Sequence, residues 1–164
     1  MFEVLTISEL LEFHLKPFDI RAVLLAKHAQ HVVLIHFPIA LFIVGVGFDF
    51  AAHWTARATF AAVAYYNLMV AALAALPVLG TGLWAWQLQF GGRKLKGILL
   101  FHLVLAFTSS TLMWFFLWLQ VRAKRAPAQH PLPSFRLPLE VLTVVIIMLT
   151  AHLGGFLSGV NAPG

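Results

Sequence analysis

The sequence contains no cysteine and few charged residues. None of its 164 residues is a cysteine, and only 10% are Asp, Glu, Lys or Arg. The lack of thiols excludes disulfide bonds, thiolate metal sites and the thioether bonds through which some proteins hold haem covalently. So little charge would not keep a domain of this size in solution, so a water-soluble fold is also excluded.

Long apolar segments dominate what is present. Hydrophobic residues make up 61% of the chain, and the mean hydropathy is +0.90. A helix that crosses ~30 Å of hydrocarbon needs about 20 apolar residues. The pattern predicts an all-α integral membrane protein, a four-helix bundle with spans at about 31–52, 64–86, 97–120 and 138–160. Short polar connections predict that consecutive helices are antiparallel neighbours.

The first 30 residues have a different pattern, in which short apolar groups alternate with charges. Leu10 and Phe13, for example, stand beside Glu9 and Glu12. This alternation predicts an N-terminal amphipathic helix at the membrane surface, or an arm that docks onto a neighbouring subunit. The chain is therefore expected to divide into an arm at 1–30 and a four-helix domain at 31–160.

The chain is basic, with a formal net charge of +5. Its Lys and Arg residues gather in the short segments beside the spans, where they bind lipid headgroups. The expected partners are therefore the lipid bilayer and other membrane subunits, and no nucleic acid is implied. With no room for a soluble domain, the chain is expected to be a redox or structural subunit rather than a self-contained enzyme.

The chain has eight histidines, which is many for so apolar a sequence. They fall into groups by their expected depth in the membrane. Those at positions 14, 28, 53 and 130 lie outside the spans or at their ends. His36 and His102 lie ~7 Å below one membrane surface, and His152 lies ~12 Å below the same surface. We therefore expect three imidazoles from three helices to converge in one leaflet, with His31 just above them at the surface.

The helical faces of these histidines predict that all three point inward. His102 shares its face with Ser109, His152 shares its face with Gly155, and His36 lies among small residues. Small neighbours permit the close approach of another helix or of a flat ligand.

Polar side chains are costly in hydrocarbon, so inward histidines indicate a function. The first hypothesis is haem b, with His36 and either His102 or His152 as axial ligands of the iron. His31 lies ~140° from His36 around a helix, so the two cannot serve one ligand from one face, although His31 could serve a second haem. Three alternatives remain open: a three-histidine metal site, a proton or quinone-headgroup site, and hydrogen bonds that only fix helix packing.

Two further residues of the first span are notable. Pro38 has no backbone N–H and is expected to kink the helix beside His36. Asp49 is the one acidic residue inside the first three spans. We expect it to pair with His53 one turn later, with Arg57 a further turn along, and so to anchor the helix end. The alternative is that Asp49 marks a proton entrance.

Several of these segments resemble one family. They are "HVVLIHFPIALF", Asp49, "GTGLWAW", His102 and "LGGFLSGV". Together they look like the four-span bacterial membrane proteins of domain-of-unknown-function family 2231, over residues 31–160. The most specific part is "H-x-x-x-x-HFPIAL". The chain departs from the family at Ala85, where members commonly carry an acidic residue before the tryptophan.

The resemblance implies a four-helix membrane fold in bacteria, hence the inner (cytoplasmic) membrane, and it implies no activity. From the histidines we expect a b-type haem-binding subunit that takes part in electron transfer within a larger respiratory or photosynthetic complex. The alternatives are a cofactor-free structural subunit that docks partner subunits, and a protein that handles quinone or protons.

Overall fold

The computed structural model describes residues 29–89, 91–92, 94–125 and 132–159, which form five helices and no strand. The helices are α3 (Ala29–Leu34), α4 (His36–Thr55), α5 (Ala58–Gln89), α6 (Gly97–Arg125) and α7 (Arg136–Leu157). The amphipathic arm expected at 1–30 lies outside the described residues, except for the two residues that begin α3.

Four helical segments are long and apolar enough to cross a membrane: His31–Thr55, Ala58–Gln87, Gly97–Arg125 and Arg136–Leu157. The predicted all-α fold with four spans is therefore confirmed. The second span begins at Ala58 instead of about 64, and the third continues to Arg125. The second span gains the mostly apolar residues 58–63, and the third continues through the basic residues that follow its apolar run.

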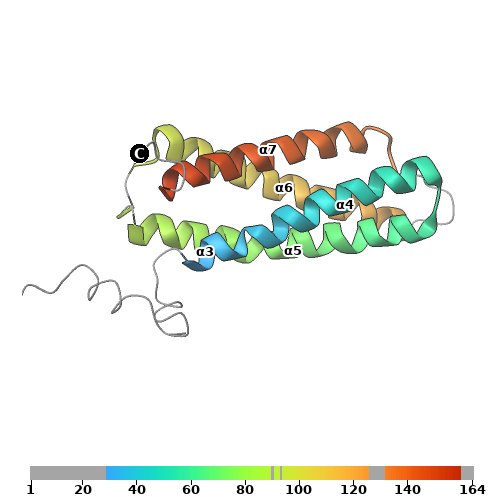
Figure 1. Ribbon diagram of the computed structural model, residues 1–164, viewed down its shortest axis with the longest axis horizontal. Coiled ribbons are helices and arrows are strands. Elements are labelled where there is room, and N and C mark those ends of the chain that lie inside the picture. Colours follow the sequence, from blue (N-terminus) through green and yellow to red (C-terminus); the bar gives the residue numbers. More distant parts are fainter. Residues whose placement is uncertain (1–28, 90, 93, 126–131, 160–164) are drawn as a thin grey trace, which may run out of the picture.

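The first span consists of two consecutive helices, α3 and α4. A turn at Ile35 separates them, three residues before Pro38. Pro38 has no N–H to donate to the carbonyl of Leu34. The N–H of Ile35 still donates to the His31 carbonyl at 3.0 Å. The span therefore continues in one general direction, with the local break that Pro38 predicts (Figure 1).

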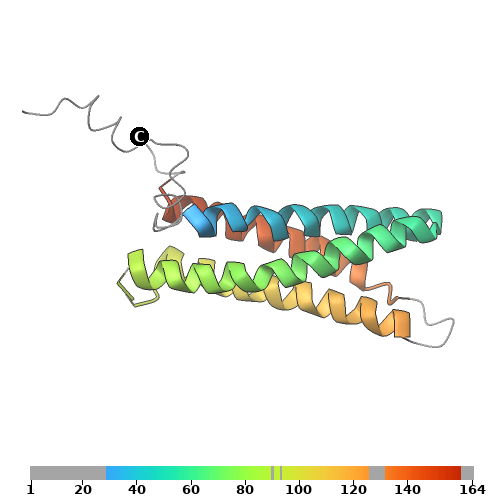
Figure 2. The same ribbon diagram turned by 90° about the horizontal axis from the view of Figure 1, so that it is seen from below.

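The four spans form an antiparallel bundle with four corners. Each helix packs against the next along the chain, and α7 closes the ring against α4. Helix α3 precedes α4 in the first span and packs on α5. Figures 1 and 2, seen from directions 90° apart, place α3 and α4 diagonally opposite α6, and α5 diagonally opposite α7.

A close-packed core fills the half of the bundle in which α4 ends and α7 begins, which we call the closed half. Phe42 of α4 and Phe116 of α6 are fully buried there. Their ring centroids lie 5.9 Å apart, so the two side chains meet across the diagonal of the bundle. Leu68 and Ile147 complete the packing from the other two corners.

The other half, which we call the open half, comprises residues 31–37, 76–87, 97–108 and 148–157. Every one of these residues is at least partly exposed. Some of this exposure is on the outside of the bundle and faces lipid, as for the side chain of Phe101. Inward-facing residues such as Thr81 and Gly154 are also partly exposed, in contrast to the buried residues of the closed half.

Candidate functional site

The histidines that face the interior are His31 and His102. Both are half-buried, whereas His36 and His152 are exposed. The prediction that His36 and His152 point inward is therefore wrong. His31 lies at the end of its span, as predicted, but its ring turns into the bundle and contacts Thr81. The inward direction of His102 is confirmed.

The register of the first span explains the exchange between His31 and His36. Its inward face passes through Pro38 and Phe42, which are buried. His31 lies seven residues before Pro38, about two helical turns, and so falls on that face. His36 shares its face with Gly47, and both are exposed. Small residues therefore do not identify the inward side of this helix, since Gly47 is exposed and Gly45 is buried.

The same reasoning applies to α7. Its inward face includes Ile147 and continues two turns later to Gly154. His152 lies outside this face, and its ring packs edge-on against Phe156 with a centroid distance of 5.0 Å. The predicted site residue Gly155 is half-buried, but the glycine that approaches a histidine is Gly154.

On α6 the expected inward face is present. Ser109 and Met113, which lie two and three turns after His102, are buried. The hydroxyl of Ser109 donates to the Ala106 carbonyl at 3.1 Å, so it is satisfied within its own helix. Ser109 therefore lines the interior without binding an imidazole.

A threonine of α5 orients the His31 ring. His31 Nδ1 lies 3.1 Å from Thr81 Oγ1. The single hydrogen of that hydroxyl is directed to the carbonyls of Pro77 at 2.9 Å and Val78 at 3.1 Å. Toward His31 the hydroxyl oxygen therefore accepts, which assigns the imidazole hydrogen to Nδ1 and leaves the lone pair on Nε2.

A backbone carbonyl of α7 orients the His102 ring in the same way. His102 Nδ1 lies 2.9 Å from the carbonyl oxygen of Thr150. A carbonyl only accepts, so Nδ1 again carries the hydrogen and Nε2 keeps its lone pair. The two inward histidines therefore share one tautomer, the one in which Nε2 is able to bind a metal ion or accept a hydrogen bond.

Each inward imidazole also lies against a glycine of the neighbouring helix. A Cβ atom at Gly82 would lie 2.9 Å from His31 Cε1, and one at Gly154 would lie 3.2 Å from His102 Cε1. Because both distances are shorter than normal packing contacts, glycine is needed at these two positions if the rings are to stay where they are.

His31 lies on α3 and His102 on α6, two helices at diagonally opposite corners of the bundle. In the described part of the chain, no group of three or more His, Asp or Glu side chains is placed to hold a metal ion. Two neutral imidazoles from opposite helices suit the two axial positions of a haem iron, or two hydrogen bonds to a flat polar headgroup.

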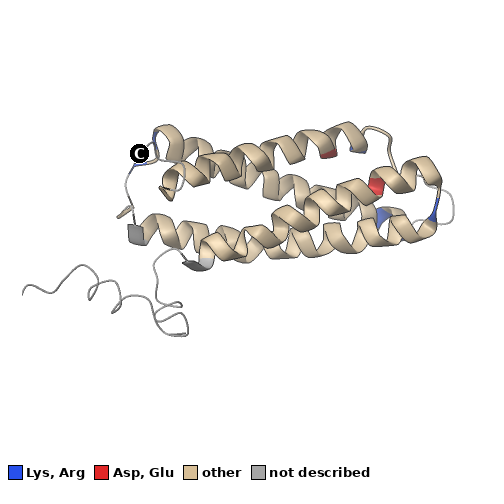
Figure 3. Ribbon diagram, in the orientation of Figure 1, with Lys and Arg blue, Asp and Glu red and all other residues tan. Residues whose placement is uncertain are grey.

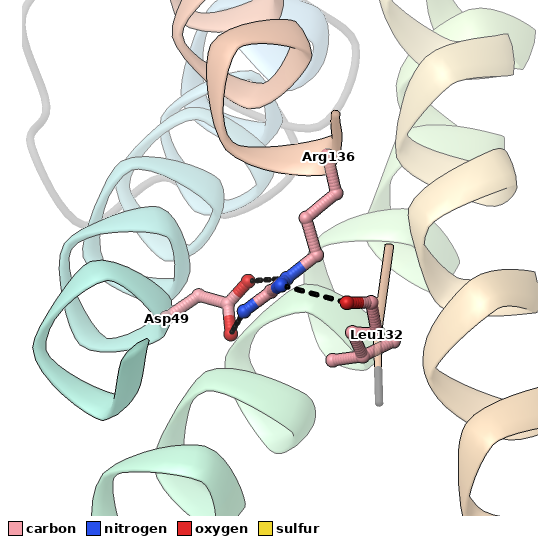
Figure 4. Close-up of polar contacts among 3 residues, drawn as sticks. All are labelled: Asp49, Leu132 and Arg136. Atoms are coloured by element: carbon pink, nitrogen blue, oxygen red, sulfur yellow. Dashed lines mark hydrogen bonds and ion pairs between the residues drawn. The ribbon is translucent and has the colours of Figure 1, made fainter. Parts of the chain in front are cut away.

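The closed half contains a second polar group of residues, Asp49, Arg136 and Glu140, which we call the carboxylate–arginine cluster. Arg136 Nε donates to Asp49 Oδ2 at 2.6 Å, and Nη2 donates to Oδ1 at 3.1 Å. Nη1 donates to the Leu132 carbonyl at 3.5 Å, as Figure 4 shows. The Asp49 and Arg136 side chains are 2% and 7% exposed, so this is a buried ion pair.

The expected pairing of Asp49 with His53 and Arg57 is wrong. Both residues are exposed, and the Arg57 guanidinium lies 5.9 Å from the centre of the Phe60 ring. Asp49 lies on the inward face of α4 and so meets Arg136 of α7 instead of its neighbours along its own helix.

Glu140 completes the cluster one turn after Arg136. It is 1% exposed, and neither of its carboxylate oxygens has a hydrogen-bond partner among the described residues. Glu140 follows Arg136 by one turn of α7, and Arg136 is bonded to Asp49, so the two carboxyl groups belong to one buried cluster. Asp49 and Glu140 are the two acidic residues of the described helices, and Figure 3 shows them on α4 and α7, within the bundle.

Sequence reasoning missed Arg136 and Glu140. The fourth span was expected to begin at about 138, which placed Arg136 in a connection. The available signal was the four-residue spacing of Arg136 and Glu140, which puts both on the same helical face as Thr143 and Ile147. A charged pair on an otherwise apolar inward face indicates a buried cluster.

Comparison with known proteins identifies the family. A family model described as "predicted membrane protein (DUF2231)" matches residues 27–161, which include all five described helices. The chain matches no curated protein and no solved structure. The family match covers most of the sequence and agrees with the observed four-span bundle. The chain therefore belongs to the DUF2231 family of predicted membrane proteins.

Proposed function

We propose that the chain is a transmembrane subunit that binds b-type haem between His31 and His102 and takes part in electron transfer. The observation that carries the proposal is the pair of inward imidazoles, on opposite corners of the open half and with the same tautomer. In this proposal His31 replaces His36 as the partner of His102, and His152 is not a ligand.

The hydrogen bonds of the two imidazoles support axial ligation. A histidine that binds a metal through one nitrogen commonly donates the other N–H to an oxygen, which fixes the ring and raises its basicity. Thr81 provides that oxygen for His31, and the Thr150 carbonyl provides it for His102. The chain's part is to hold both rings in place, and bound haem would supply the one-electron chemistry.

The partial exposure of inward residues in the open half supports a flat ligand. Large buried rings close the other half, whereas inward residues here, such as Val78 and Leu105, remain partly exposed. Gly82 and Gly154 let each imidazole lie close to a helix backbone. Apolar groups around a macrocycle would also exclude water, which is one of the ways in which a protein tunes a redox potential.

The position of the two histidines supports a role in a larger assembly. They lie where α3 and α6 begin, near one end of the bundle and hence near one membrane surface. An electron carrier placed there is close to a partner at that surface. We place the chain in the bacterial inner membrane, as one subunit of a respiratory or photosynthetic complex.

The test is to express the full chain in cells supplied with a haem precursor, purify it in detergent and record its reduced-minus-oxidised spectrum. We expect a b-type spectrum, and we expect added haemin to bind any haem-free chain. A double variant, His31→Ala with His102→Ala, should bind no haemin at this site. A colourless wild-type preparation that also binds no haemin would contradict the proposal and favour a cofactor-free subunit or a quinone site.

A further inference from the structure

We propose that the carboxylate–arginine cluster is a proton-binding site, in which Asp49 and Glu140 share one exchangeable proton. This proposal does not depend on haem binding. Ten residues of α7 separate Glu140 from Thr150, the partner of His102, which corresponds to ~15 Å along the helix. The two sites therefore occupy opposite halves of the bundle.

Charge balance is the first support. The cluster contains two carboxyl groups and one guanidinium group, and all three side chains are buried. Arg136 makes two hydrogen bonds to Asp49 and so neutralises that carboxylate. A second buried carboxylate would have no cation of its own and would face a neighbouring negative charge, which is strongly unfavourable.

The surroundings of Glu140 are the second support. Both of its side-chain oxygens are buried without a hydrogen-bond partner among the described residues. Its neighbour Asp49 has only acceptor oxygens when it is ionised. A hydrogen bond between the two carboxyl groups therefore requires a proton on one of them. One shared proton satisfies Glu140 and removes the excess negative charge.

Other charged groups of this half do not offer Glu140 a second cation. His53 of α4 and Arg57, in the connection between α4 and α5, are exposed. On α6, the exposed Lys124 has its ammonium group 3.3 Å from the centre of the Tyr65 ring. Gln120 of α6 is buried and uncharged. Arg136 is therefore the one buried cation described in this half, and it is already paired.

A proton suits this cluster better than a metal cation does. A sodium or calcium ion needs several oxygen ligands, and Arg136 already occupies both oxygens of Asp49. The neighbouring hydroxyl of Thr143 donates to the Leu139 carbonyl at 2.7 Å and lies within its own helix turn. The guanidinium charge would also repel a second cation. A proton needs only two facing oxygens.

The cluster lies near the end of the bundle, so a proton has a short path to water. Asp49 is six residues before the end of α4 at Thr55, ~9 Å along the helix. Arg136 is the first residue of α7, and the carbonyl it reaches, that of Leu132, belongs to the preceding connection. Proton exchange is therefore expected with the aqueous phase at this end.

Infrared spectroscopy tests the proposal on the purified full chain in lipid vesicles. A neutral carboxylic acid has a C=O stretching band that carboxylates lack and that shifts in D₂O. We expect one such band from the cluster at neutral pH, and we expect it to disappear reversibly as the pH is raised. The matched control is His36→Ala, which removes an exposed titratable group and should leave the band unchanged.

Three variants distinguish the shared proton from a fixed, ionised cluster. Glu140→Gln and Asp49→Asn each leave one carboxyl group for one guanidinium, so each should abolish the band. Arg136→Gln leaves two carboxyl groups without a cation, so the band should grow. Because these outcomes differ in direction, the failure of any one variant to fold leaves the other two as tests.

Three results would overturn the proposal. The first is that the wild-type band is absent, which would mean that both carboxyl groups are ionised. The second is that Glu140→Gln and Asp49→Asn both retain the band. The third is that sodium chloride added at constant pH removes the band while potassium chloride does not, which would make the site a sodium site.

Discussion

The guanidinium of Arg136 connects α7 to Asp49 of α4 through two hydrogen bonds that span 87 positions of the sequence. These two helices occupy neighbouring corners of the bundle. The pair is bidentate and buried, so it fixes the register of α7 against α4 in the closed half. Removing one partner of a buried ion pair leaves an uncompensated charge, which is more costly than the pair is stabilising.

The first prediction concerns the stability of this cluster. Asp49→Asn alone should cost little free energy of unfolding, because Glu140 can then pair with Arg136. The double variant Asp49→Asn with Glu140→Gln leaves the guanidinium unpaired and should cost about 3–5 kcal/mol. Reversible unfolding in mixed detergent micelles measures the difference. Equal costs for the single and double variants would show that Glu140 does not replace Asp49.

The second prediction concerns the glycines that contact the inward histidines. Gly82→Ala and Gly154→Ala should push the imidazoles of His31 and His102 out of position, because the new Cβ atoms would lie 2.9 and 3.2 Å from the rings. Haemin affinity should therefore fall in both variants, as a haemin titration would measure.

Gly80 and Gly47 provide matched controls for that prediction, because a Cβ atom at either position meets nothing within 4 Å. Both lie in helices, where alanine is favoured over glycine by roughly 1 kcal/mol. Gly80→Ala and Gly47→Ala should therefore keep haemin affinity and leave stability unchanged or slightly raised. Equal loss of affinity in all four variants would mean that the effect is not at the rings.

The third prediction concerns the partner of His31. Thr81→Val removes the hydroxyl that accepts from His31 Nδ1 and keeps the shape of the side chain. Loss of such an outer partner typically weakens metal binding by about 10–100-fold. Haemin titration measures the change. Thr150→Val is the control, because His102 is bonded to the Thr150 carbonyl, which the substitution keeps. A larger effect of Thr150→Val would contradict the assigned partners.

The fourth prediction concerns the closed half. Phe42→Ala should create a cavity against Phe116 and cost up to about 3–5 kcal/mol of unfolding free energy, the usual range for buried Phe→Ala. We expect a cost at the lower end of this range, because the helices stay in apolar lipid when the bundle comes apart. Phe37→Ala is the control, since the Phe37 side chain is 58% exposed and faces lipid. Similar losses for both would indicate that Phe42 does not fill the core.

The number and approximate position of the spans could be predicted from the sequence, because a span is defined by length and hydropathy. Which face of each span points into the bundle could not be predicted in the same way. In a membrane both faces of a helix are apolar, so hydrophobic periodicity carries little information about direction. Small residues beside His36 and His152 suggested an interior, whereas Phe42 and Ile147 mark the interior in the structure.

The candidate site was predicted in part. His102 was assigned to the interior correctly, since Ser109 and Met113 continue its face and are buried. His31 and His36 differ in exposure, as residues on different faces would, but the wrong member of the pair was turned inward. Arg136 was missed because a charged residue just before the expected start of a span looks like part of a connection. Glu140 was missed because its nearest cation, Arg136, was then placed outside the span. The contact between Arg136 and Asp49 depends on how α7 packs against α4.

Four single variants test the central claim, that His31 and His102 are the axial ligands of a b-type haem. The measurement is the reduced-minus-oxidised spectrum of each purified variant, normalised to protein. His31→Ala and His102→Ala should each lose the wild-type b-type spectrum, while His36→Ala and His152→Ala should keep it. Loss in His36→Ala and His152→Ala, with retention in His31→Ala and His102→Ala, would contradict the claim.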